Sequence, residues 1–192
     1  MGREFELKFH ATPQQMAAIL EDFTGFREIT MVSTYYDTPD CSLAPLRWTL
    51  RQRMENEVSV CTLKTPCQEG GRCEWEVECA DIMGAIDELC KQGAPEELKA
   101  LVAGGLEPVC SARFTRQATL LELENCSVEL AVDKGILKGG FRIQLLGDVE
   151  VELKSGSDAD VIAFAKTLAA KYGLVTERNS KYLRALNLTG KI

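Results

Sequence analysis

The chain has 192 residues, 45% of them hydrophobic, and a formal net charge of −7. A chain of this length and composition can bury a proper core as one domain, and its negative charge argues against nucleic acid as the main partner. It contains no run of eighteen apolar residues and its N-terminus enters a strand pattern at once, so we expect a soluble, cytoplasmic protein with no membrane partner.

The chain contains eight cysteines but no Cys-x-x-Cys pair, and it has a single histidine. A zinc site is therefore poorly supported. Because nothing in the sequence indicates export, we expect reduced thiols rather than disulfides.

The N-terminal stretch, residues 3–10, alternates charged and apolar side chains without interruption. On a strand, side chains point to opposite faces with a period of two, so Glu4, Glu6 and Lys8 share one face. Two carboxylates and an ammonium group in one row suit a divalent cation that is bound together with an anion.

A helix is expected after this strand. Thr12 is its predicted N-cap, Pro13 is its first residue and Gln15 completes a capping box, and the helix should end near Phe23. Residues 29–37 are rich in β-branched and aromatic side chains and predict a second strand.

A second charged face begins with residues 47–53, which predict a strand. Its alternation places Arg47, Arg51 and Arg53 on one face and Trp48 and Leu50 on the other. The three arginines therefore belong to a charged surface whose opposite side packs against a core.

Two further strands continue this pattern. Residues 58–64 predict one strand, which carries Lys64. Residues 72–79 predict the other and alternate strictly, so that an arginine and three glutamates, including Glu76, share one face and apolar residues share the opposite face. A helix should follow, with Asp81 as its candidate N-cap.

Residues 111–123 predict a strand that is long enough to bend around a barrel. If Leu121 and Leu123 are on its packed face, Arg116 is on the charged face and Arg113 is not, unless a β-bulge intervenes. We favour Arg116 and keep both arginines as candidates.

The last strands complete the charged face. A strand over 128–133 places Asp133 on the charged side, and the next one repeats the N-terminal Glu-x-Glu-x-Lys pattern as Glu150, Glu152 and Lys154. Two such strands that face one cavity would supply four carboxylates, enough oxygen ligands for one or two hard divalent cations.

A helix from Ser157 and a closing helical segment over 179–184 complete the expected elements. About eight strands with charge on one face and apolar residues on the other predict an α+β fold: a closed antiparallel β-barrel around a charged tunnel, with helices packed outside. The alternative is an open sheet whose charged face lies in water.

Six segments of the chain share a pattern with a known family. They are Glu4-Phe5-Glu6-Leu7-Lys8, Tyr35-Tyr36-Asp37-Thr38-Pro39-Asp40, Leu50-Arg51-Gln52-Arg53, Thr62-Leu63-Lys64-Thr65, Glu74-Trp75-Glu76-Val77 and Glu150-Val151-Glu152-Leu153-Lys154. Together they resemble the CYTH domain, or triphosphate tunnel metalloenzyme superfamily, and most of all its bacterial inorganic triphosphatases. The resemblance implies one such domain over 1–192, either standing alone or belonging to a longer chain with a C-terminal helical domain.

The resemblance implies a Mg²⁺-dependent enzyme, with Mn²⁺ as the alternative cofactor, that hydrolyses inorganic triphosphate to pyrophosphate and orthophosphate. A nucleoside or thiamine triphosphatase and a class IV adenylyl cyclase are alternatives, because one fold serves several substrates. A non-catalytic polyphosphate- or nucleotide-binding module is another. In each case the partner is a small-molecule triphosphate, and the protein could be a monomer or a homodimer.

The resemblance also implies roles for individual residues. The metal ligands would be Glu4, Glu6, Glu76, Asp133, Glu150 and Glu152. The phosphates would be held by Lys8, Arg51, Arg53, Lys64, Arg113 or Arg116, Lys154 and Lys181. The catalytic set would be Glu4, Glu6, Lys8, Arg51, Arg53 and Lys64. Phe114 stands where some relatives have a lysine, which weakens the case for a Tyr-Lys catalytic pair.

Overall fold

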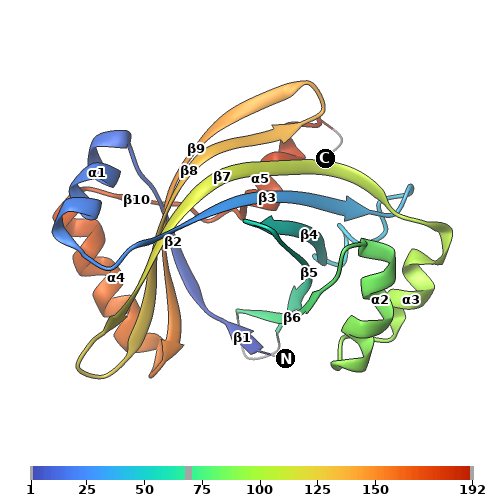
Figure 1. Cartoon of the computed structure of the whole chain (residues 1–192), viewed down its shortest axis with the longest axis horizontal. Coiled ribbons are helices and arrows are strands. Elements are labelled where there is room, and N and C mark those ends of the chain that lie inside the picture. Colours follow the sequence, from blue (N-terminus) through green and yellow to red (C-terminus); the bar gives the residue numbers. More distant parts are fainter. Residues whose placement is uncertain (1, 68–70, 191–192) are drawn as a thin grey trace.

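The computed structural model describes residues 2–67 and 71–190. Its strands form one antiparallel sheet in the order β1-β6-β5-β4-β3-β7-β8-β9-β2-β10 (Figure 1). The strands are β1 Gly2–Glu4, β2 Glu6–His10, β3 Arg27–Asp37, β4 Thr49–Glu55, β5 Val58–Pro66, β6 Arg72–Glu78, β7 Glu107–Glu122, β8 Ser127–Gly139, β9 Arg142–Ser155 and β10 Val175–Thr176. The helices are α1 Pro13–Asp22, α2 Ile82–Lys91, α3 Glu97–Leu101, α4 Asp158–Tyr172 and α5 Lys181–Asn187, with a 3-10 turn, η1, at Val102–Gly104.

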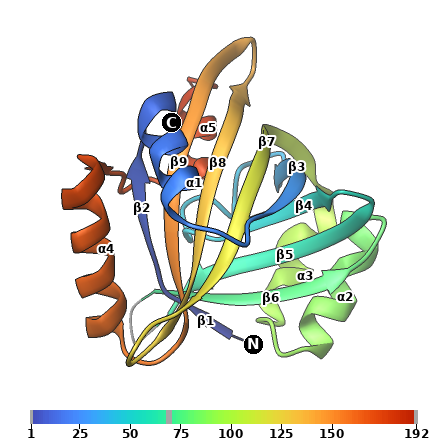
Figure 2. The same ribbon diagram turned by 60° about the vertical axis from the view of Figure 1, so that its left-hand side comes forward.

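The α+β fold and its antiparallel strands are confirmed, but the expected closed barrel is wrong. The sheet has two edges, β1 and β10, and no strand pairing within the described ranges joins them. The N-terminal stretch is not one strand, because β1 pairs with β6 whereas β2 pairs with β9. Phe5 alone separates β1 from β2. The chain itself, and not a ladder of hydrogen bonds, therefore connects the two sides of a strongly curved sheet (Figure 2).

The helix starts follow local capping chemistry, and both predicted N-caps, Thr12 and Asp81, are confirmed. Thr12 accepts a hydrogen bond from the Gln15 backbone N–H and forms the expected capping box with the Gln15 side chain. Asp81 accepts a hydrogen bond from the Gly84 backbone N–H at the start of α2, and Ser157 accepts one from the Asp160 backbone N–H at the start of α4.

The helices cover the two ends of the sheet's outer face. Leu50 and Leu63 pack beneath α2, where Leu89 is fully buried. At the other end, Val149 and Val151 of β9 lie in a second core that α1 and α4 cover. Because the apolar residues of each strand are buried on this side, the charged residues between them point to the concave side.

The short helix α5 packs on the concave side. Tyr182 and Leu186 form a third core with Tyr35 and Phe114, and the Tyr35 and Tyr182 ring centroids are 5.2 Å apart. Apolar packing thus covers one part of the concave face and leaves the charged part beside it. In the parts of the chain that the structure describes, no helix is both long and apolar enough to cross a membrane.

The expectation of reduced cysteines is wrong for one pair. Cys67 and Cys73 form a disulfide across the β5–β6 hairpin, with their Cα atoms 5.2 Å apart. The hairpin brings the two thiols together although they are six positions apart, so a search for closely spaced pairs does not find them. The remaining cysteines are free: Cys41, Cys61, Cys79, Cys90, Cys110 and Cys126.

Candidate active site

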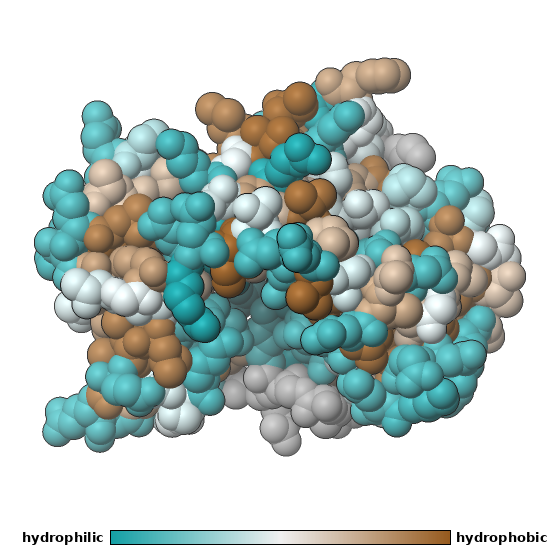
Figure 3. Space-filling model, viewed as in Figure 1, coloured by the Kyte–Doolittle hydropathy of each residue, from teal (hydrophilic) through white to brown (hydrophobic). Residues whose placement is uncertain are grey.

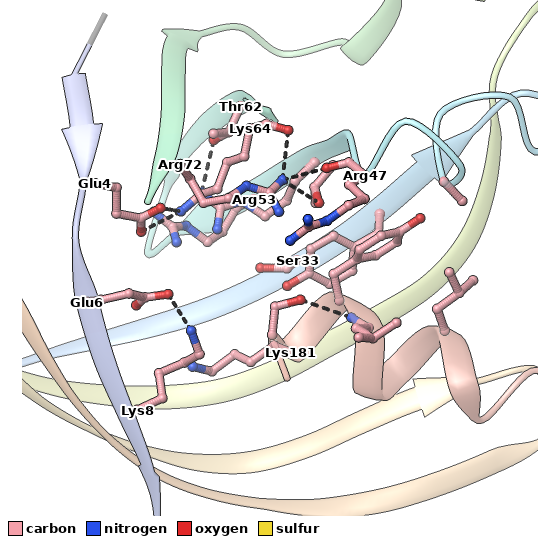
Figure 4. Close-up of a pocket in the computed structure, with 18 of the residues that line it drawn as sticks. Glu4, Glu6, Lys8, Ser33, Arg47, Arg53, Thr62, Lys64, Arg72 and Lys181 are labelled. Atoms are coloured by element: carbon pink, nitrogen blue, oxygen red, sulfur yellow. Dashed lines mark hydrogen bonds and ion pairs between the residues drawn. The ribbon is translucent and has the colours of Figure 1, made fainter. Parts of the chain in front are cut away.

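A cavity of about 680 Å³ lies on the concave face of the sheet. Residues of β1, β2 and β9 line it on one side, residues of β4 and β5 on the other, and α5 contributes Lys181 and Tyr182. Figure 4 shows the charged groups of the two sides pointing toward one another. In Figure 3, hydrophilic residues surround a hollow near the centre of the molecule.

The cavity lining carries more positive than negative charge. Nine of the lining residues are lysine or arginine: Lys8, Arg47, Arg51, Arg53, Lys64, Arg72, Arg116, Arg178 and Lys181. Five are acidic: Glu4, Glu6, Asp40, Glu150 and Glu152. This excess is opposite in sign to the charge of the whole chain, so the cavity is suited to a small polyanion.

The basic wall is built by alternation along β4. Leu50 points into the core beneath α2, so Arg51 and Arg53 point into the cavity. Arg51 donates to Thr62 Oγ1 at 2.9 Å and lies 3.3 Å from Glu76 Oε1. Burial, together with the positive charge of Arg51, lowers the pKa of Arg53. An anion between these two guanidinium groups would relieve both effects.

Three guanidinium groups of this wall have unused donors. The Nε atoms of Arg51, Arg53 and Arg72 are buried and find no hydrogen-bond acceptor among the described residues. A buried polar hydrogen without an acceptor is unfavourable, so these donors are consistent with a ligand that supplies oxygen atoms.

Carboxylates form the opposite wall, and lysines neutralise them. Lys64 Nζ of β5 lies 2.6 Å from Glu4 Oε1 of β1, and Lys8 Nζ lies 2.7 Å from Glu6 Oε1 (Figure 4). Glu152 is opposite Glu6 in the β2–β9 ladder. The Lys64–Glu4 pair joins β5 to β1, whereas the Lys8–Glu6 pair lies within β2.

The negative charge around Glu152 is incompletely balanced. Burial raises the pKa of its carboxyl group, and the like charges of Glu4 and Glu129 raise it further, although Lys154 acts in the opposite direction. A cation at this position would remove the repulsion among the three carboxylates.

The donors around Glu152 are chemically suited to a hard divalent cation, because they are carboxylate oxygens with excess negative charge. Their present arrangement is not a metal site. Over residues 2–67 and 71–190, no three acidic, histidine or cysteine side chains converge closely enough to hold a metal ion. Binding would require Glu6 to turn from Lys8, and Glu152 from Lys154.

A buried ion network connects the cavity lining with the residues behind it. Lys181 Nζ is 2.8 Å from Asp133 Oδ2 and 2.5 Å from Glu150 Oε1. Arg116 bonds the same two carboxylates, with its Nη2 2.7 Å from Asp133 Oδ2. Although burial alone would raise it, Lys181 and Arg116 hold the pKa of Glu150 well below its usual range. Asp148 is also fully buried and pairs with Arg184.

The cavity brings together most of the residues selected from the sequence. Those that line it are Glu4, Glu6, Lys8, Arg51, Arg53, Lys64, Arg116, Glu150, Glu152 and Lys181. Their faces follow from the period-two pattern of each strand. The roles assigned to them stay predictions.

Four of the predicted site residues do not line the cavity. Arg113 is exposed, because the β7–β8 ladder runs without a bulge and places it on the face opposite to Arg116. Lys154 lies beyond the last β2–β9 pair and binds Glu152. Glu76 holds Arg51, and Asp133 is fully buried behind Arg116 and Lys181. Asp133 therefore orients basic groups and does not reach the cavity as a metal ligand.

Three basic residues that line the cavity are not among the candidate site residues: Arg47, Arg72 and Arg178. Alternation places Arg47 on the charged face with Arg51 and Arg53, but no role is predicted for it. A signal for Arg72 existed, because it shares the alternating face of Glu74 and Glu76. Arg72 donates to the backbone oxygens of Arg47 and Lys64, which fixes its position on the wall. Arg178 precedes α5 outside any strand pattern, so no periodicity could have identified it.

Comparison with known protein families identifies the family of this chain. The model of the CYTH domain matches residues 2–186, nearly the whole chain. The chain belongs to the CYTH domain family. The resemblance inferred from the sequence motifs is thereby confirmed.

Relatives of this CYTH domain include the inorganic triphosphatase of Haemophilus influenzae, which is 30% identical over 200 residues. That match covers 100% of this chain and 56% of the relative, so the chain spans about half the length of that protein. Two solved structures share the fold. A Hippeastrum protein described as having a dominant triphosphatase activity has a TM-score of 0.69 at 18% identity, with 100% of this chain and 97% of that one covered. A Pyrococcus horikoshii protein has a TM-score of 0.63 at 21% identity, with 96% and 98% covered.

Proposed function

We propose that this CYTH domain is a divalent-metal-dependent triphosphatase that hydrolyses inorganic triphosphate to pyrophosphate and orthophosphate. The observation that carries the proposal is one cavity in which basic side chains of β4 and β5 face carboxylates of β1, β2 and β9. The similarity to an inorganic triphosphatase supports the choice of substrate.

In this proposal, the basic wall binds the phosphate chain. Arg51 and Arg53 are two positions apart on one strand face, so both can reach the same polyphosphate. A guanidinium group donates two parallel hydrogen bonds to phosphate oxygens, and the unused Nε donors of both arginines are available for them. Lys8 and Lys64, which now neutralise Glu6 and Glu4, would turn toward the phosphates when a ligand enters.

The carboxylates Glu4, Glu6, Glu150 and Glu152 would hold Mg²⁺ or Mn²⁺, with Glu152 as the group whose charge is least balanced. When bound, the cation would draw charge from the phosphates and increase the acidity of a water molecule. The protein's own contribution is to hold the terminal phosphoryl group between the two walls, in line for attack by water.

The aromatic residues of the cavity favour a substrate without a nucleobase. Tyr35, Phe114 and Tyr182 line the cavity, but all three are buried. The rings of Tyr35 and Tyr182 pack on each other, and Lys181 lies 5.2 Å from the Phe114 ring centroid. These contacts and their burial leave the three rings little exposed surface on which a base could stack.

We predict that inorganic triphosphate is hydrolysed with a higher kcat/KM than ATP or thiamine triphosphate. Phosphate release from a panel of these compounds, measured with Mg²⁺ and with Mn²⁺, tests the prediction. A tenfold preference for ATP or thiamine triphosphate would contradict the substrate assignment. Such a preference corresponds to roughly 1.4 kcal/mol of stronger transition-state binding. Release of pyrophosphate from ATP would indicate a cyclase, and tight binding without turnover would indicate a binding module.

A second prediction concerns the unbalanced charge of Glu152. Without metal, Glu152→Gln should raise the melting temperature by about 2–4 °C, because the loss of one charge relieves repulsion worth about 1 kcal/mol in a domain of this size. Added Mg²⁺ should raise the melting temperature of the wild-type protein more than that of Glu152→Gln. The variant should also lose most of its turnover of inorganic triphosphate. The matched control is Glu124→Gln at an exposed position. Equal Mg²⁺ responses in the two variants would remove Glu152 from the metal site.

A further inference from the structure

The β8–β9 hairpin exposes a row of large apolar side chains outside the cavity. Phe141 at its turn is fully exposed, and Ile143 and Leu145 are 60% and 79% exposed. Ile136 is opposite Leu145 on the neighbouring strand and extends the row. In Figure 3, hydrophobic residues gather at the top of the molecule, over the hairpin that Figure 1 shows there. Helices α1 and α4 cover one end of the outer face, and α2 and α3 cover the other end. Neither pair covers the β8–β9 hairpin (Figure 2).

The same hairpin has a free main-chain edge. β2 pairs with β9 only from Asp148 to Glu152, and the Ala11 N–H bonds the Gly147 carbonyl as the last contact of that ladder. Over residues 142–146, β9 pairs with β8 on one side, and on the other side no described segment of the chain supplies a strand. Edge strands of this kind are templates for the addition of another strand.

Unpaired basic side chains surround the hairpin. They are Arg113, Lys134, Lys138 and Arg142. Within the described residues, none of these four forms an ion pair with a carboxylate. Lys138 is opposite Ile143 on one face of the hairpin, whereas Arg142 precedes Ile143 and lies on the other face. Arg113 and Lys134 lie on the same face as Lys138, so three basic groups flank the apolar row and Arg142 alone marks the other face. This local positive charge, on a chain with a net charge of −7, favours an acidic partner through its field around the edge, with Arg142 as the group in direct reach of acidic side chains on the other face.

We propose that the outer edge of β9 at residues 142–146 binds an extended peptide segment that alternates apolar and acidic residues. Its main chain would pair with the free edge, its apolar side chains would pack beside Ile143 and Leu145, and its acidic side chains would meet Arg142 on the opposite face. A second copy of this chain fits the site poorly, because each copy carries the same unpaired basic side chains around this edge and pairing two such edges would bring like charges near one another. A lipid surface would leave the main-chain edge without strand partners.

The probe is a set of fluorescein-labelled ten-residue peptides that alternate valine or isoleucine with glutamate, and fluorescence anisotropy measures their binding to the whole chain. We expect at least one peptide to bind and to slow amide hydrogen exchange at residues 142–146. The double variant Ile143→Ser, Leu145→Ser should weaken binding by about tenfold or more, since both side chains are at the centre of the contact. Val175→Ser, at the opposite edge strand β10 and 67% exposed, is the matched control and should bind like the wild type. Peptides with lysine in place of glutamate should not bind.

Several results would overturn the proposal. One is that no peptide binds at concentrations up to about 1 mM, the range of weak recognition. Another is that protection from exchange appears outside residues 142–146, or that Val175→Ser weakens binding as much as the double variant. Dimerisation of the wild-type protein with protection at 142–146 would make a second copy the occupant. Binding to phosphatidylserine vesicles that Phe141→Ser abolishes, without peptide binding, would make it a lipid surface. Triphosphate hydrolysis by the double variant should equal that of the wild type, so this test is independent of the proposed activity.

Discussion

Replacing Lys181 by methionine should lower the free energy of unfolding by about 3–5 kcal/mol, because it removes one of the two cations, Lys181 and Arg116, that are bonded to the buried carboxylates of Asp133 and Glu150. Lys181 lies 2.8 Å from Asp133 and 2.5 Å from Glu150, and Asp133 is fully buried. In a domain of this size, the loss corresponds to a fall in melting temperature of roughly 6–20 °C. Urea unfolding at equilibrium measures it directly.

The control for this prediction is a lysine in an exposed ion pair. Lys171 Nζ lies 2.7 Å from Asp22, but its side chain is 57% exposed, so Lys171→Met should change stability far less than Lys181→Met. Asp133→Asn added to Lys181→Met should restore part of the loss, because it removes one of the uncompensated charges. If both lysine variants were equally stable, the network behind the cavity would not be a structural element of the fold.

The strand faces could be predicted from the sequence because they depend on local alternation. Arg51 and Arg53 line the cavity for the same reason that Leu50 is buried, since neighbouring residues of a strand point to opposite sides. The same rule separates Arg116 from Arg113 once the β7–β8 ladder is known to be regular. Capping boxes are also local, which explains why the start of α1 at Pro13 was correct.

Alternation could not predict that the sheet stays open or how deeply each charged side chain is buried, because both depend on contacts between distant segments. Alternation continues through Phe5, yet β1 and β2 pair with strands from different parts of the chain. Asp133 has the face expected from its position, but Lys181 from α5 covers it, so it ends in a buried network and not at the cavity surface. The Cys67–Cys73 disulfide follows from the hairpin and not from a spacing motif.

Arg51→Ala should reduce kcat/KM for inorganic triphosphate by roughly ten- to a hundred-and-fifty-fold, which is the usual effect of removing one charge-assisted hydrogen-bonding group of about 1.5–3 kcal/mol. The fold should tolerate the change, because its partner Glu76 has a side chain that is 43% exposed and can be hydrated. Arg51→Lys should recover only part of the activity, since lysine keeps the charge but cannot donate two parallel hydrogen bonds.

The comparison with Glu6→Gln separates the two walls of the cavity. Glu6 bonds Lys8 at 2.7 Å and would have to turn from it to bind a cation, whereas Arg51, a cation itself, bonds Thr62 and Glu76. A titration with Mg²⁺ or Mn²⁺ should therefore restore part of the activity of Glu6→Gln, because mass action compensates for weakened metal binding. The same titration should leave the defect of Arg51→Ala unchanged, because in the proposed function the missing group binds phosphate and not the cation. Identical metal responses would show that the cavity is not divided into an anion-binding wall and a metal-binding wall.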